Sequence, residues 1–258
     1  DAASATPKMS SVACSMTALG QGAEPVLQIA ARDVTRVVLQ GQVLGASAMG
    51  IRNILVLTGD SARLGETPMS RSDLVDLDSV QMLWVLRRMR DEGIYLGGRS
   101  IKTPPKFFLG AAASPFASEP HFQALREQKK VDAGAQFFQT NLAFEVDGLE
   151  KWLNALAKRN ILDKVYILIG ITPLKSYKMA KYLDEDVPGV KVPKQILQRL
   201  EAAGEDGAPE EGFNIAMELI QSIRKLQGVN GIHLMPVYWE EIVPRIVKEA
   251  GLDKAVVS

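Results

Sequence analysis

The residues easiest to connect with chemistry lie directly after a strand-like segment. Thr58-Gly59-Asp60 follows the apolar run 53–57, which reads NILVL. A glycine there lets a ligand approach the backbone closely, and the Asp60 carboxylate can polarise a ligand or carry a proton. The same three residues also suit an ordinary turn, since Asp beside Gly is common turn chemistry. Position alone leaves both interpretations open.

Very small side chains mark the end of a second apolar run. Residues 110–113 read Gly-Ala-Ala-Ala and precede Ser114-Pro115. Ala112 and Ala113 would let a flat ligand ring lie on the backbone. The alternative is tight packing of a helix on the strand, which the sequence alone favours.

Polar and aromatic groups follow other apolar runs. Gln139-Thr140-Asn141 offers amide and hydroxyl groups that can pair with the edge of a pterin or flavin, or satisfy loop backbone. Lys130 can bind a phosphate or remain solvated. Tyr177 and Trp239 can stack on a ring or simply pack. These are the remaining candidates for cofactor and substrate binding.

The segments that must position these residues alternate between short apolar runs and helical patterns. The apolar runs read as strands of a parallel sheet buried on both faces. They are 26–30, 53–57, 107–113, 137–141, 165–171 and 231–235, with a weak polar candidate at Asp1–Thr6. Met82, Val85, Leu86 and Met89 recur at helical spacing, as do apolar residues within 213–220 and 242–247. The segments Ser61–Ser72, Leu183–Pro193 and Ala202–Glu210 have turn chemistry and are predicted to be connections.

Repeated strand–helix units leave two architectures, a doubly wound open sheet or a closed barrel. No Gly-x-Gly-x-x-Gly follows a strand, which disfavours the dinucleotide-binding fold. Counting the strand and helix candidates, we expect a single α/β domain over residues 1–258, a (β/α)₈ TIM barrel whose first strand is absent from this chain.

Composition excludes several classes of partner. Thirty basic and thirty acidic residues cancel, so net charge gives no reason to expect nucleic acid or an anionic membrane surface as a partner. The single cysteine and two histidines exclude an intrachain disulfide and a Cys/His metal site. No apolar run reaches membrane-spanning length and no signal peptide opens the sequence. We therefore expect a cytoplasmic protein.

Taken in order, these strand ends resemble the methylenetetrahydrofolate reductase family across essentially the whole chain. The matching stretches are Gly50–Asp60, Lys130–Ala135 with Gln139-Thr140, and Gly170–Pro173. Others resemble most the reductase subunit of acetogens and related anaerobes: Asp76–Ser79, Met89–Gly93, Phe108–Phe116 and Tyr238–Glu241 with Pro244.

The resemblance implies a flavin, FAD or FMN, reduced by NAD(P)H or by a partner redox protein. The reduced flavin would pass hydride to 5,10-methylenetetrahydrofolate, giving 5-methyltetrahydrofolate in one-carbon metabolism and methionine biosynthesis. Asp60 matches the family's aspartate near the flavin pyrimidine edge, and we expect it to be catalytic. The residues expected to bind the flavin are Gln28, Thr58, Gly59, Asp60, Ala112, Ala113 and Lys130. Asn141, Tyr177 and Trp239 are expected to bind substrate, and the protein is expected to be an oligomer.

Several positions depart from the family's pattern. Gln28 replaces a histidine, Thr58 an arginine, and Ala113 and Ala117 a tyrosine and a histidine. The family's catalytic glutamate lies on the first strand, so either the complete protein is longer or this proton donor is missing. An alternative to the active reductase is therefore a catalytically weakened barrel that acts as a scaffold subunit in a redox complex. A pterin-dependent methyltransferase is a weaker alternative, because no zinc or corrinoid ligand set supports it.

Overall fold

The computed structural model describes residues 7–60, 75–187 and 189–252. The weak strand candidate Asp1–Thr6 and the predicted connection Ser61–Ser72 lie outside the described residues.

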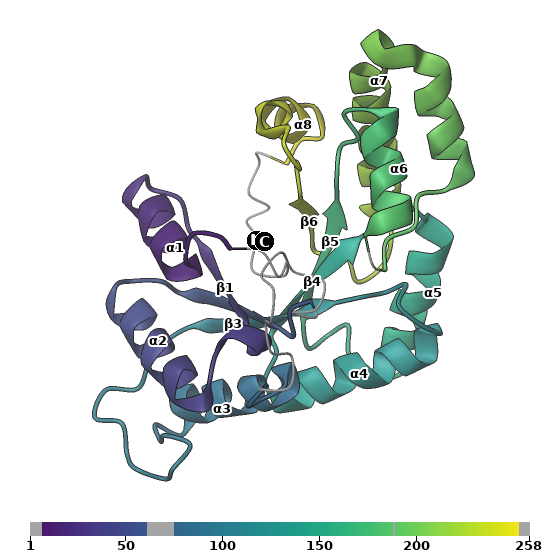
Figure 1. The fold of residues 1–258 in the computed structure, drawn as a ribbon. Helices are drawn as coiled ribbons and strands as arrows, with labels where there is room; N and C mark the ends of the chain where they lie inside the picture. The colour runs from purple at the N-terminus through teal and green to yellow at the C-terminus, as the bar shows by residue number, and fades with distance from the viewer. Residues whose placement is uncertain (1–6, 61–74, 188, 253–258) are drawn as a thin grey trace. The chain divides into compact units, whose positions relative to one another are not determined.

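Strands and helices alternate along the described chain (Figure 1). The strands are β1 (Val26–Ala30), β2 (Asn53–Leu57), β3 (Phe108–Ala113), β4 (Phe137–Leu142), β5 (Tyr166–Ile171) and β6 (Gly231–Leu234). The α-helices are α1 (Ser11–Gly20), α2 (Arg36–Ala48), α3 (Ser79–Asp91), α4 (Pro120–Ala133), α5 (Val146–Ala157), α6 (Tyr177–Asp186), α7 (Lys194–Ile223) and α8 (Val243–Glu249). The sheet order is the chain order, and β1–β2, β2–β3 and β5–β6 pair in parallel. The predicted α/β class and its six apolar strands are confirmed.

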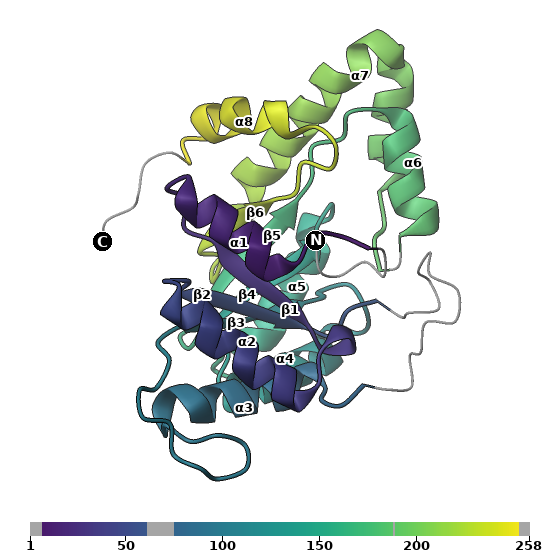
Figure 2. The same cartoon turned by 60° about the vertical axis from the view of Figure 1, so that its left-hand side comes forward.

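The chain divides into two compact units, each described here by itself. The first comprises Asp1–Ala112 and Arg126–Phe138. In it α1 packs against β1 and α3 against β2, while α2 lies beside α3 (Figure 2). The strands are in register, with Ala30 opposite Leu57 and Val56 opposite Ala111. The carboxyl ends of β1, β2 and β3 therefore meet at one edge of the sheet.

An apolar cluster supports that edge from one face of the sheet. Its buried members are Ala30, Leu55, Leu57 and Phe137, against which Val26, Phe108 and Ala112 pack. The Phe108 and Phe137 rings stack with centroids 5.3 Å apart. A side chain at Gly110 would overlap the Phe137 ring. Gly110 is therefore needed for close packing, although its neighbour is a ring of strand β4 and not a helix, as the simpler interpretation of the small-residue run had it.

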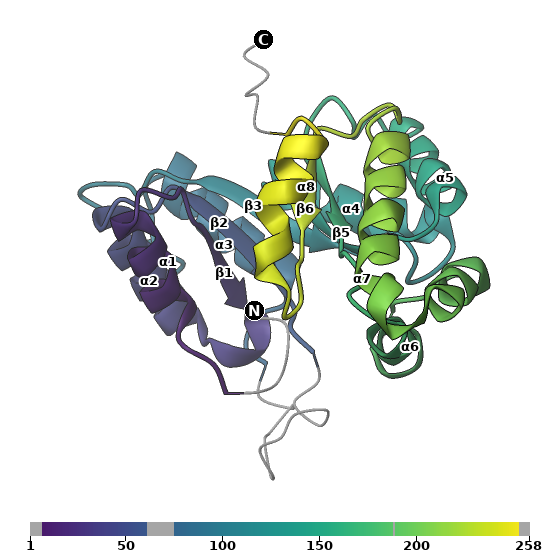
Figure 3. The ribbon, with the colours of Figure 1, turned by 90° about the horizontal axis from the view of Figure 1, so that it is seen from above.

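The second unit comprises Ala113–Leu125 and Gln139–Ser258. Its helix α7 packs on β5 and beside α6 (Figure 3). The prediction that Ala202–Glu210 is a solvated connection is wrong, because these residues belong to α7. Gly204 takes φ 68° and ψ 177°, which is not a helical conformation, so α7 consists of two helical segments joined by a kink at Gly204.

The acidic residues that suggested a loop are instead partners of arginines on the helical surface. Glu211 pairs with Arg199 at 2.5 Å, and Glu210 pairs with Arg245 of α8 at 2.7 Å. The Leu183–Pro193 connection begins later than predicted, since α6 continues to Asp186. The segment was missed as a helix because it has many acidic residues and no apolar periodicity. Ion pairs stabilise the polar face of this helix.

Candidate functional site

The turn after β2 lies beside the turn after β1, as the parallel register requires. The Arg32 backbone N–H donates to the Thr58 carbonyl at 3.2 Å, and Arg32 Nη1 donates to the Asp60 carbonyl at 2.7 Å. Thr58 and Asp60 are exposed, and Gly59 is partly exposed. The structure therefore brings Thr58-Gly59-Asp60 to the carboxyl edge of the sheet, where parallel α/β proteins place ligand-binding groups.

Gly59 takes a left-handed backbone conformation, with φ +82°. A Cβ atom there would lie 3.2 Å from the Ala30 Cβ and 3.1 Å from Arg32 Nη1. Both the backbone angle and the close neighbours favour glycine. Gly59 therefore forms a tight turn at the strand end, and its role in ligand binding stays a prediction.

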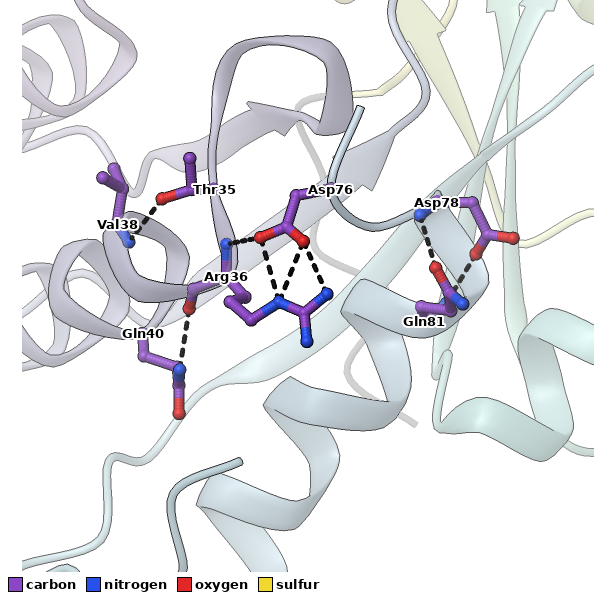
Figure 4. Close-up of polar contacts among 7 residues, drawn as sticks. All are labelled: Thr35, Arg36, Val38, Gln40, Asp76, Asp78 and Gln81. Carbon is purple, nitrogen blue, oxygen red and sulfur yellow. Dashed lines mark hydrogen bonds and ion pairs between the residues drawn. The ribbon is translucent and has the colours of Figure 1, made fainter. Parts of the chain in front are cut away.

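The segment that leads into α3 is anchored at the same edge (Figure 4). Asp76 accepts from the Arg36 backbone N–H at 2.7 Å and from the Arg36 guanidinium at 2.6 and 2.8 Å. The guanidinium holds the pKa of Asp76 below its usual value. The stretch Asp76–Ser79 is thereby tied to the first residue of α2.

The same stretch begins α3 and touches the end of β2. Asp78 and Gln81 form a reciprocal capping box, with hydrogen bonds of 2.7 and 2.9 Å (Figure 4). The Thr58 hydroxyl lies 3.4 Å from the Ser79 hydroxyl. The stretch Asp76–Ser79 therefore holds α2, α3 and the β2 turn in one arrangement.

Gln28 and Ala112 lie on the cluster face of their strands. Alternate residues of a strand share a face, and Val26, Ala30, Phe108 and Ala112 all contact the apolar cluster. Gln28 lies between Val26 and Ala30 on that face and is partly buried. The cluster face is therefore where these two predicted residues can meet a ligand.

Ala113 follows Ala112 and so points to the opposite face of β3, where it is 2% exposed. Lys130 supports the same strand end, because its ammonium donates to the Ala112 carbonyl at 2.7 Å and to Glu127 at 2.9 Å. Glu127 is fully buried. Lys130 is thus an anchored side chain rather than a solvated one.

In the second unit, β4 and β5 approach each other through Gly170. The Gly170 N–H donates to the Thr140 hydroxyl at 2.9 Å, and a Cβ on Gly170 would lie 2.6 Å from the Thr140 carbonyl oxygen. The Asn141 amide oxygen accepts from the Leu142 N–H at 2.8 Å. The amide NH₂ is therefore the part of Asn141 that can donate to a ligand.

Four buried polar atoms of this unit have no hydrogen-bond partner among the described residues. They are Trp152 Nε1 on α5 and three atoms on or just after strands: Thr172 Oγ1, just after β5, Gln139 Oε1 on β4 and His233 Nδ1 on β6. Thr172 is 2% exposed, and burial lowers the pKa of His233. Buried polar atoms are normally hydrogen-bonded, so these are groups that a bound ligand or water would satisfy.

The predicted aromatic residues lie in two βα connections of the second unit. Tyr177 is the first residue of α6 and follows the N-cap Ser176, whose hydroxyl accepts from the Met179 N–H at 3.1 Å. Trp239 follows β6, and the Lys175 ammonium lies 6.0 Å from the centroid of its ring. Both are partly buried, which leaves part of each ring accessible.

Arg32 and Thr172 were not identified as candidates from the sequence. The sequence contains one signal for Arg32: Arg32-Asp33 comes just after one strand, and Gly59-Asp60 comes just after the next. Thr172 gave none beyond its position at a strand end, since its unpartnered hydroxyl is visible only in three dimensions.

Within each unit, the candidate residues fit a flat ring with a polar edge. In the first unit, Gly59 and Ala112 offer bare backbone and a small side chain, beside the Asp60 carboxylate. In the second, Asn141 and Thr172 offer a donor and an unpartnered hydroxyl. Such groups match the edges of flavin and pterin rings, which carry both donors and acceptors.

The described ranges hold no group of three or more His, Cys, Asp and Glu side chains able to bind a metal ion. None of their helices is both long enough and apolar enough to span a bilayer.

Curated relatives match most of the chain. A "Methylenetetrahydrofolate reductase 2" of Schizosaccharomyces pombe is 26% identical over 234 residues, 88% of this chain and 35% of the relative. A "Probable methylenetetrahydrofolate reductase (NADPH)" of Caenorhabditis elegans is 28% identical, over 81% of this chain and 29% of the relative. The "5,10-methylenetetrahydrofolate reductase" of Escherichia coli is 28% identical, over 79% of this chain and 62% of the relative. The chain thus spans about a third of the two eukaryotic relatives and less than two thirds of the bacterial one.

Two solved structures share the fold. An uncharacterised Clostridium thermocellum protein that binds two copies of 5-methyl-5,6,7,8-tetrahydrofolic acid has a TM-score of 0.56 and 15% identity, over 88% of this chain and 72% of its own. A riboflavin lyase, solved with modified FMN and riboflavin, has a TM-score of 0.51 and 12% identity, over 96% of this chain and 75% of its own. The predicted TIM-barrel class is confirmed. The sequence profile of the methylenetetrahydrofolate reductase family matches residues 1–251, and the chain belongs to that family.

Proposed function

We propose that this chain is the flavin-dependent barrel of a methylenetetrahydrofolate reductase, reducing 5,10-methylenetetrahydrofolate to 5-methyltetrahydrofolate. The observation that carries the proposal is the exposed Gly59–Asp60 turn at the carboxyl edge of the sheet, held by Arg32. An acidic side chain beside bare backbone suits a ring with hydrogen-bond donors on its edge. Membership of the methylenetetrahydrofolate reductase family supports this choice of reaction.

The flavin would be held mainly by residues of the first unit. Gln28 and Ala112 share the cluster face, while Thr58, Gly59 and Asp60 form the turn at the strand edge. Of its three donors, the Lys130 ammonium gives two to Glu127 and Ala112, which leaves one for a cofactor phosphate. Ala113, on the opposite face of β3, would support the same strand end through packing and not through contact with the flavin.

Three further side chains are proposed for the folate. The Asn141 amide NH₂ would donate to the pterin edge, and Tyr177 and Trp239 would pack against its rings. The Clostridium thermocellum structure supports a folate ligand, since that protein shares the fold and binds a methylated folate.

A bound flavin would supply a hydride for the methylene carbon of the substrate. Forming the 5-methyl product would also need a proton at N10, for which solvent would be the source. Asp60 would accept hydrogen bonds from ring N–H groups and so orient the reacting carbon. Electrons would reach the flavin from NAD(P)H or from a partner redox subunit. We further propose a cytoplasmic oligomer, as expected from the sequence.

The test is anaerobic turnover of the purified protein with 5,10-methylenetetrahydrofolate and each of three donors: NADH, NADPH and reduced viologen dye. We expect 5-methyltetrahydrofolate to form with at least one donor, as measured by mass spectrometry. A flavin-loaded protein that forms no product with any donor would support the scaffold alternative instead.

A further inference from the structure

The Arg32 side chain is fixed by its neighbour in the sequence. Arg32 Nε donates to Asp33 Oδ1 and Arg32 Nη2 to Asp33 Oδ2, both at 2.8 Å. The Arg32 side chain is 10% exposed, whereas that of Asp33 is 56% exposed. A two-point pair of this kind restricts the guanidinium plane. It leaves Nη1 directed at the turn after β2.

This third guanidinium nitrogen meets the turn that carries Asp60. Nη1 donates to the Asp60 carbonyl at 2.7 Å, while the Arg32 N–H donates to the Thr58 carbonyl at 3.2 Å. The guanidinium carbon would lie only 3.2 Å from a Cβ on Gly59. Arg32 therefore hydrogen-bonds to the Thr58 and Asp60 carbonyls at the two ends of the turn, and its guanidinium packs against Gly59 between them.

The positive charge of the Arg32 guanidinium also interacts with the negative charge of Asp60. The hydrogen bond that Arg32 donates to Asp33 is the main cause of a raised pKa for Arg32, opposed by burial and reinforced by the charges of Asp33 and Asp60. Arg32 is thus a permanent cation that interacts with the Asp60 carboxylate through space as well as with its backbone.

We propose that Arg32 is the positioning residue for Asp60, fixing the turn so that the Asp60 carboxylate meets the folate in one orientation. The proposal rests on the proposed function. The proposal assigns no contact between Arg32 and the substrate, since the Arg32 side-chain nitrogens donate to Asp33 and to the Asp60 carbonyl. The effect of Arg32 on folate binding should therefore pass through Asp60.

The chain contains a matched control for this arrangement. Arg90 pairs with the adjacent Asp91 through Nε at 2.6 Å and through Nη2 at 3.0 Å. The Arg90 and Asp91 side chains are 18% and 49% exposed, and Arg90 Nη1 also bonds Gln136. Arg90 lies near the end of α3, outside the proposed binding residues. Arg90→Gln thus removes the same kind of pair without touching the Asp60 turn.

The experiment is a double-mutant cycle read out by calorimetric binding of 5-methyltetrahydrofolate, with the melting temperature of each variant measured alongside. Arg32→Gln should weaken binding about tenfold, the scale of one charged hydrogen bond. Arg90→Gln should change it less than about twofold at a similar loss of stability. In an Asp60→Asn background, Arg32→Gln should add less than about twofold.

Two results would overturn the inference: unchanged binding by Arg32→Gln, or the full tenfold loss persisting in Asp60→Asn. If Arg32→Gln does not fold, Asp33→Asn keeps the arginine but loosens it, and should weaken binding by an intermediate factor. Unchanged binding by Asp33→Asn would then overturn it. A folded wild-type protein that binds no methyltetrahydrofolate contradicts the proposed function as well, which distinguishes the two failures.

Discussion

At the scale of single residues, the candidate site depends on a tight backbone turn at Gly59. Gly59 lies at φ +82° with Ala30 and Arg32 against it, so the turn accepts no larger side chain without movement. Asp60 follows directly and remains exposed. Gly59 therefore permits the tight turn, and the Asp60 carboxylate next to it stays accessible.

Asp60→Asn should fold normally yet slow folate reduction much more than flavin reduction. Loss of the charge removes a charged hydrogen bond to the folate, on the order of 1–3 kcal/mol. Rapid-reaction kinetics of the two half-reactions would measure both steps. Equal rates to wild type in both would remove Asp60 from the site.

Leucine substitutions at Ala112 and Ala113 should have different effects, because the two side chains point to opposite faces of β3. Ala112→Leu should expel the flavin, since Ala112 shares the face of Gln28. Ala113→Leu should keep the flavin but lower the free energy of unfolding by about 1–3 kcal/mol through overpacking. Flavin content and denaturant unfolding of each variant give the comparison. The reverse pattern would place the cofactor on the Ala113 side.

At the scale of elements, the stretch Asp76–Ser79 connects α2, α3 and the end of β2. Asp76 bonds the first N–H of α2, and Asp78 caps α3. Ser79 then meets the Thr58 hydroxyl. Losing one of these contacts should thus lower the free energy of unfolding more than it weakens ligand binding.

Asp78→Ala should lower the free energy of unfolding by about 1 kcal/mol, the usual effect of losing an N-cap. Asp78→Ser keeps an oxygen that can accept from the Gln81 N–H, and serves as the control. Urea unfolding of the two variants measures the difference. Equal stability of Asp78→Ala and Asp78→Ser would mean that the capping box contributes nothing.

At the scale of the whole molecule, the strands were predictable because each is a short apolar run that a parallel sheet buries on both faces. Helix α7 was not, because Gly204 and the acidic residues around it read as a connection. The ion pairs of Glu210 and Glu211 join positions far apart in sequence. Arg32 was overlooked for the same reason, since its partner Asp60 lies 28 positions away. The spacing of residues in the sequence predicts helices and strands, whereas contacts between different elements become visible only in the folded structure.

His233 should make the stability of the fold depend on pH. Burial lowers its pKa from the ordinary value of 6.5, so the unfolded chain binds a proton that the folded chain resists. This contribution is fully present above about pH 6.5 and is lost as the pH falls below it. Unfolding free energies of wild type and His233→Gln, compared from pH 8 to pH 5, on the order of the His titration range, should diverge in slope below about pH 6.5. Parallel curves would show that His233 is not desolvated.

The most direct test of the central claim is one anaerobic absorbance titration of the purified protein. We predict yellow flavin bands in the protein as isolated, their loss on reduction, and their return when 5,10-methylenetetrahydrofolate is added in stoichiometric amount. The return shows that electrons pass from the bound cofactor to the folate. Protein that takes up no flavin, or reduced flavin that stays bleached in the presence of the folate, would contradict the account.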